Sequence, residues 1–163
     1  MAQQHLKFAI FGNEYQAKKS ASIMRILSYL EKREAEVYIE SLFYDFLTKV
    51  EHLEVQAAGV FEDYNFDVDY VISMGGDGTF LKAASRVGAK GTPILGVNMG
   101  RLGFLADVLP GEIDSALDSL YAGECRIEEH AIIEVKAEGG ILAGYPFALN
   151  DICLLYTSDA ADE

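Results

Sequence analysis

One stretch, residues 70–87, constrains the fold more than any other part of the chain. Residues 70–74 (YVISM) are apolar and predict a buried strand, and residues 80–87 predict a helix. Between them lies the glycine-rich turn Gly75-Gly76-Asp77-Gly78-Thr79. Glycines let the backbone turn sharply and approach a ligand closely, and amides at a helix start favour an anion. A ligand site at the junction of a strand and a helix is therefore expected.

The acidic residue in this turn, Asp77, indicates a chemical role beyond phosphate binding. A carboxylate among phosphate-binding amides would repel a phosphate group. It is better suited to accept a proton from a hydroxyl or to hold a divalent cation. The alternative is a tight turn in which Asp77 only caps the helix, because aspartate is a common capping residue. The local pattern leaves both interpretations open.

Strand and helix patterns alternate through the first two thirds of the chain. Buried strands are predicted at residues 6–12, 37–39 and 94–97, and helices over 14–34, 43–50 and 110–121. This alternation indicates an α/β fold, a Rossmann-like parallel sheet with helices on both faces. Ligands of such sheets bind outside the carboxyl ends of the strands, so the turn after Met74 and the loop at 98–105 should share one crevice. Residues 51–67 are acidic and show no clear pattern.

The period of the pattern changes to two after residue 130. Residues 131–138 alternate between inward and outward positions, Gly139-Gly140 indicates a hairpin turn, and residues 141–149 form the returning strand. We therefore expect an α/β domain over residues 1–107 and the start of an antiparallel β domain over 108–152. Two strands are too few to close a core, so this β domain is expected to be incomplete.

Composition excludes several classes of function. The net charge of -13 argues against a general nucleic-acid-binding surface and against a polybasic membrane anchor. Two cysteines are too few for a disulfide framework or a closed zinc site, and the three histidines lack metal-binding spacing. No apolar run approaches the length of a membrane span. A cytoplasmic protein without a protein-built metal site, nucleic-acid partner or membrane partner is expected.

Three motifs together resemble the ATP-dependent NAD kinases, over about residues 6–152. They are residues 75–81 (GGDGTFL), 98–105 (NMGRLGFL) and 149–152 (LNDI). The first is shared with lipid kinases and phosphofructokinases, whereas the other two, in this order, are specific to NAD kinases. The resemblance implies that NAD binds between the α/β domain and the β domain. It also implies ATP as the second substrate, a divalent cation with Mg²⁺ as the expected ion, and a homo-oligomer.

The same resemblance implies a role for each residue that matches a motif. Asp77 would be the general base that takes the proton from the 2′-hydroxyl of the adenosine ribose, whose oxygen then attacks the γ-phosphoryl group of ATP. Phe104 would line the adenine pocket, and Asn150-Asp151 would hold the nicotinamide-side ribose. The expected dinucleotide-binding residues are Gly75, Gly76, Gly78, Thr79, Lys82, Phe104, Asn150 and Asp151. Judged by themselves, Lys82 also fits a surface lysine, Phe104 a core ring, and Asn150-Asp151 a plain turn.

The last eleven residues depart from the family pattern. Family members continue into a further β domain after the Asn-acid pair, whereas residues 153–163 resemble the translation of a transposase adapter used in preparing sequencing libraries. We therefore expect a non-native tail on a truncated, inactive fragment. Two other functions stay open: a kinase with the same turn acting on a lipid or sugar phosphate, and a non-catalytic dinucleotide-binding protein. The motif at 98–105 argues against the first of these.

Overall fold

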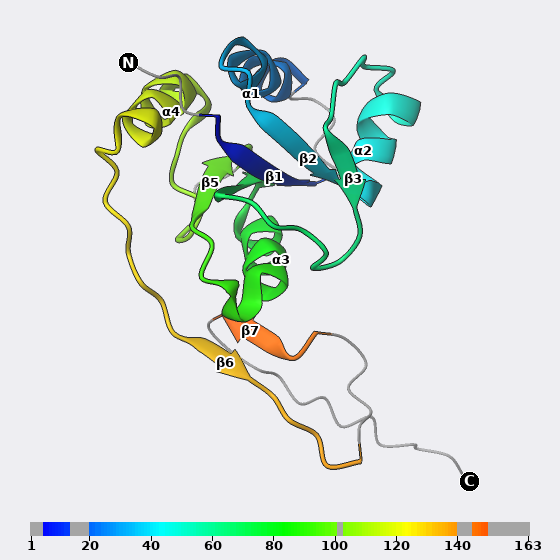
Figure 1. Ribbon diagram of the computed structural model, residues 1–163, viewed down its shortest axis with the longest axis vertical. Helices are drawn as coiled ribbons and strands as arrows, with labels where there is room; N and C mark the ends of the chain where they lie inside the picture. The colour runs from blue at the N-terminus through cyan, green and yellow to red at the C-terminus, as the bar shows by residue number, and fades with distance from the viewer. Residues whose placement is uncertain (1–4, 14–19, 101–102, 140–144, 150–163) are drawn as a thin grey trace, which may run out of the picture.

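A five-stranded parallel sheet forms the centre of the protein. The computed structural model describes residues 5–13, 20–100, 103–139 and 145–149. The strand order is β3-β2-β1-β4-β5, and every neighbouring pair is parallel (Figure 1). The strands are β1 (Lys7–Gly12), β2 (Glu36–Glu40), β3 (Gly59–Phe61), β4 (Tyr70–Gly75) and β5 (Ile94–Asn98). The predicted parallel sheet is confirmed, and β3 falls in the acidic segment that showed no pattern.

Helices cover both faces of this sheet, as predicted. Figure 1 shows α1 and α4 on one side and α3 on the other. The sidedness follows from strand alternation: Ile72 and Met74 of β4 join the core under α1 and α4, while Val71 joins the core under α3. The helices are α1 (Ser20–Lys32), α2 (Ser41–Asp45), α3 (Asp77–Val87) and α4 (Ile113–Ala122), with short turns η2 (Phe46–Val50), η3 (Gly88–Lys90) and η4 (Pro110–Glu112).

The start of α3 differs from the sequence prediction. The helix begins at Asp77, three residues before the predicted start at residue 80. Gly76 is the N-cap residue in an extended conformation, so the Asp77-Gly78-Thr79 segment forms the first helical turn. Glycine is unfavourable in the interior of a helix but is tolerated in its first turn. The glycine-rich sequence had therefore indicated a loop at these residues. Asp77 is thereby placed at the positive end of the helix dipole.

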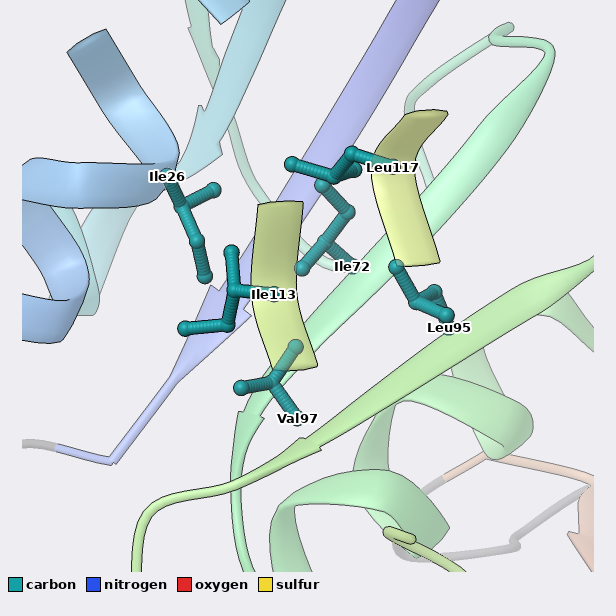
Figure 2. Close-up of a pocket in the computed structure, with 6 residues that line it drawn as sticks. All are labelled: Ile26, Ile72, Leu95, Val97, Ile113 and Leu117. Carbon is teal, nitrogen blue, oxygen red and sulfur yellow. The ribbon is translucent and has the colours of Figure 1, made fainter. Parts of the chain in front are cut away.

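Helix α4 packs against the sheet together with α1. Figure 2 shows a small apolar gap between them, lined by aliphatic side chains from α1, β4, β5 and α4: Ile26, Ile72, Leu95, Val97, Ile113 and Leu117. This gap has no polar lining side chain and lies on the face opposite α3, so it is a packing feature. The domain boundary expected at residue 107 stays a prediction, and the packing of α4 favours a position after Ala122.

A two-stranded antiparallel sheet follows α4. It consists of β6 (Ile132–Glu134) and β7 (Phe147–Leu149), with Ile133 opposite Ala148. The predicted antiparallel pairing is confirmed with shorter strands, and Gly140 of the predicted turn lies outside the described residues. Strand β7 contacts the end of α3, where the Phe147 ring lies against Gly88. Among the described residues, no helix is both long and apolar enough to cross a membrane.

Candidate functional site

The candidate site lies at the point in the sheet where the order in which strands are added reverses. From β1 the chain adds β2 and β3 on one side, then returns to add β4 and β5 on the other. The backbone N–H of Asn13, just after β1, donates to the carbonyl oxygen of Met74 in β4 at 3.2 Å. The carboxyl ends of β1 and β4 are thus held side by side. Open α/β sheets bind ligands outside such a switch point, and the Asp77 turn follows β4 there.

The Asp77 carboxylate is held by three backbone amides of the second glycine-rich loop. Its Oδ2 accepts the N–H of Phe104 at 2.9 Å, and its Oδ1 accepts those of Leu105 at 3.0 Å and Ala106 at 3.3 Å. Hydrogen bonds to the charged form, with the bond from Phe104 the largest cause, lower the pKa of Asp77 below its usual range. The two motifs were predicted to lie close together, and in the structure they are in direct contact through the side chain of Asp77.

Close packing between Asp77 and Gly103 explains a glycine in the second loop. A Cβ atom on Gly103 would lie 2.3 Å from Oδ1 of Asp77 and 2.5 Å from its Cγ and Oδ2. Such distances are far below van der Waals contact, so any side chain at 103 would displace the carboxylate. Gly103 is needed here for space rather than for an unusual backbone angle, because its φ lies outside the left-handed region.

The buried amide of Asn98 organises the same loop. Asn98 ends β5 and is 1% exposed. Its Nδ2 donates to the carbonyl oxygen of Ala106 at 3.2 Å, and its Oδ1 accepts the N–H of Gly100 at 2.8 Å. These bonds tie the two ends of the loop to the strand. Sequence reasoning quoted Asn98 as part of a motif but gave it no role, although an amide at a strand end before a glycine is a signal of loop organisation.

The glycines of the first motif divide into two kinds. A Cβ on Gly75 would lie 2.2 Å from Oγ1 of Thr79, a buried side chain, so Gly75 and Thr79 pack against each other. A Cβ on Gly76 or Gly78 would meet no atom within 4 Å. Protein packing therefore explains Gly75, whereas the open space at Gly76 and Gly78 leaves room for a ligand to approach the backbone.

The Phe104 ring is fully exposed, with 100% relative accessibility. The sequence left open whether this ring packs in the core or lines a site, and the structure places it outside the core. Its backbone N–H donates to the Asp77 carboxylate, while its ring is open to solvent. A flat apolar ring in this position can stack on a nucleobase.

Lys82 is joined to a residue that sequence reasoning missed. Its Nζ lies 2.7 Å from Oε1 of Glu40, and the two side chains are 33% and 7% exposed. Glu40 ends β2, and its Oε2 accepts the backbone N–H of Phe43 at 3.2 Å, which caps α2. Lys82 is therefore an ion-paired, partly exposed lysine, and its role in binding the dinucleotide stays a prediction. The strand was predicted to end at residue 39, and an acidic residue one position later carried no signal of its own.

Two of the expected site residues, Asn150 and Asp151, lie outside the described residues, as do residues 153–163. Within the described ranges, no group of three or more His, Cys, Asp or Glu side chains is arranged to hold a metal ion. The described site therefore consists of the first glycine-rich motif with Asp77, the described part of the second motif with Phe104, and the Lys82–Glu40 pair.

The sequence of this α/β region matches a known family. Residues 8–125 match the family model of the ATP-NAD kinase N-terminal domain. The chain belongs to the NAD kinase family. The match covers the sheet, its helices and both glycine-rich motifs, so this family membership includes every described site residue.

Two curated NAD kinases and one solved kinase structure resemble the chain. The NAD kinase of Bacteroides fragilis is 49% identical over 150 residues, which are 92% of this chain and 52% of that protein. The NAD kinase of Porphyromonas gingivalis is 39% identical over 149 residues, 91% of this chain and 51% of that protein. The chain thus spans about half the length of the curated relatives it matches.

The solved structure is that of yeast NADH kinase complexed with NADH. It matches with a TM-score of 0.60 at 16% identity, covering 80% of this chain and 42% of the yeast chain. At this identity the likeness supports the fold alone. It agrees with the parallel five-stranded sheet followed by antiparallel strands.

Proposed function

We propose that this chain carries the catalytic aspartate of an NAD kinase, which transfers the γ-phosphoryl group of ATP to the 2′-hydroxyl of the adenosine ribose of NAD. The observation that carries this proposal is the Asp77 carboxylate, fixed by three loop amides at the switch point of the sheet. Membership of the NAD kinase family supports the choice of reaction. The exposed ring of Phe104, a residue whose backbone N–H binds the carboxylate, supports an adenine-containing acceptor.

The contacts of Asp77 define what this side chain can do. A carboxylate has about four acceptor positions, and the three amides use three of them. One position on Oδ2 remains for the hydroxyl of the acceptor. In this role Asp77 accepts the hydroxyl proton as the oxygen attacks the phosphoryl group. The loop amides fix the direction of that remaining position, so the attacking oxygen is oriented as well as deprotonated.

Other parts of the site have supporting roles in this proposal. The open backbone at Gly76 and Gly78 and the first turn of α3 would receive the dinucleotide, and Gly75 and Thr79 would keep the turn in shape. Asn150 and Asp151 are proposed to bind the second ribose. The described residues do not form a metal site of their own, because no three or more His, Cys, Asp or Glu side chains among them are grouped to hold an ion, so no step is assigned to a divalent cation.

The test is NAD phosphorylation by the protein translated from the complete reading frame that contains this chain. Asp77→Asn should lower kcat by about 10²–10⁴, the range expected for loss of a general base. Asp114→Asn is the matched control, because Asp114 is a paired surface carboxylate on the face opposite α3. Calorimetric titration should show NAD binding retained in the Asp77→Asn protein.

Three results would contradict the proposal. Full activity of the Asp77→Asn protein would remove Asp77 as the base. Binding of NAD without turnover by the unmodified protein would identify a dinucleotide sensor. Phosphorylation of a lipid or a sugar phosphate in place of NAD would identify another kinase that uses the same turn.

A further inference from the structure

Among the ion pairs of the described residues, Glu40–Lys82 is the one that has a buried partner. Glu40 is 5% exposed. Its pairing with Lys82 connects α3 to the end of β2, which lies two strands away from β4 in the sheet. Lys82 lies five residues after Asp77 on α3, which corresponds to about 7.5 Å of helix rise. The pair is therefore on the order of 10 Å from Asp77, given the spacing of neighbouring strands.

We infer that Glu40 is a specificity-determining residue, which neutralises Lys82 so that the crevice does not favour the phosphorylated dinucleotide over the unphosphorylated one. This inference rests on the proposed function, since it concerns the two ligands of that reaction. A buried carboxylate 2.7 Å from an ammonium cancels most of its field at larger distances. The site then presents a charged lysine that is fixed in place, within a pair that has no net charge.

For an NAD kinase, the substrate and the product differ in charge. The product carries one phosphate group more than the substrate, which adds about -1.5 to -2 charges at neutral pH. An unpaired ammonium on the order of 10 Å away would attract this added charge and would hold the product back. In water-like screening the attraction corresponds to roughly a threefold to fourfold gain in affinity for the product alone. Pairing with Glu40 removes this gain.

A purely structural role for Glu40 makes a different prediction. Its side chain also caps α2 through the N–H of Phe43, and loss of that bond would loosen the end of β2. Such loosening would affect the binding of both dinucleotides alike and would leave the ratio of their dissociation constants unchanged. The ratio of the Kd for NAD to the Kd for NADP therefore isolates the effect of charge.

The experiment measures this ratio by calorimetry without ATP, on the protein from the complete reading frame, at low salt. Glu40→Gln keeps an acceptor oxygen for the cap but removes the charge, and should raise the ratio roughly threefold to fourfold. Lys82→Met should lower it by a similar factor. The double variant should restore the original ratio, because the two charge changes cancel. Glu40→Asp keeps the charge and should leave the ratio as it is.

Salt and a distant ion pair supply the controls. Raising the salt to 1 M should abolish the effect of Glu40→Gln, because the Debye length falls to about 3 Å. Asp114→Asn breaks the exposed pair with Arg25 on the opposite face and should not move the ratio. An unchanged ratio in Glu40→Gln at low salt, or a double variant that differs from the unmodified protein, would overturn the inference. Because only binding is measured, this failure is distinct from failure of the proposed kinase activity.

Discussion

Replacing Gly103 by alanine tests whether the position of Asp77, and not only its presence, is needed for activity. The new Cβ would lie 2.3 Å from Oδ1 of Asp77. To reach an ordinary contact, the carboxylate or the loop has to move by roughly 1 Å. A displacement of this size at a reacting group costs about 100-fold in rate, so we expect kcat for NAD phosphorylation to fall by about that factor. The backbone at 103 tolerates alanine, because its φ is not left-handed.

The assay is steady-state kinetics of the full reading-frame product, with thermal unfolding measured in parallel. Gly111→Ala is the matched control, since its Cβ would meet no atom within 4 Å and its φ is also not left-handed. We expect the control to keep kcat and both proteins to unfold at similar temperatures, because neither Gly103 nor Gly111 is buried. A Gly103→Ala protein with kcat within threefold of the unmodified one would refute the reasoning about position.

Three further outcomes are expected. Leu117→Ala, at a side chain that is 1% exposed beside the apolar gap, should lower the free energy of unfolding by about 2–5 kcal/mol in chemical denaturation, and a loss below 1 kcal/mol would contradict the packing of α4. Phe104→Ala should leave that free energy within about 0.5 kcal/mol but raise KM for NAD at least fivefold, because the ring is exposed and base stacking is lost. The pKa of Asp77 is lowered, so its contacts with the loop amides should survive as the pH falls to the usual carboxyl pKa of about 3.9. They should be lost only at a lower pH, where Asp77 becomes protonated. Amide chemical shifts of Phe104 and Leu105 followed by NMR from pH 7 downward check this, and a transition near pH 6 would contradict it.

The parallel sheet could be predicted because each strand carries its own signal. Strands β1, β4 and β5 are short apolar runs that end at a glycine or an asparagine, and such runs are typical of strands buried on both faces. Strand β3 could not be predicted, because it is an edge strand of three residues with Val60 exposed. An edge strand needs little hydrophobic pattern, since its pairing with β2 supplies most of its stability.

The candidate site could be predicted as a place but not as a set of contacts. Both glycine-rich loops follow strands of a parallel sheet, and this alone puts them at one edge. The sequence could not show that Asp77 binds the amides of Phe104–Ala106, because these are backbone groups and carry no residue-specific signal. Glu40 was missed for a related reason: its partner Lys82 is 42 residues away, and the pairing depends on how α3 lies on the sheet.

The environment of Asp77 limits how it can promote the reaction. The amides that fix the carboxylate also lower its pKa, and a lower pKa makes it a weaker base. A site selected for basicity alone would have placed this carboxylate in an apolar pocket, where its pKa would rise. Phosphoryl transfer through a loose transition state needs little proton removal before the attack, so orientation of the hydroxyl counts for more than strength of the base. In this reasoning the loop at 103–106 contributes to catalysis through the position of Asp77, which is why the smallest possible change at Gly103 is expected to be costly.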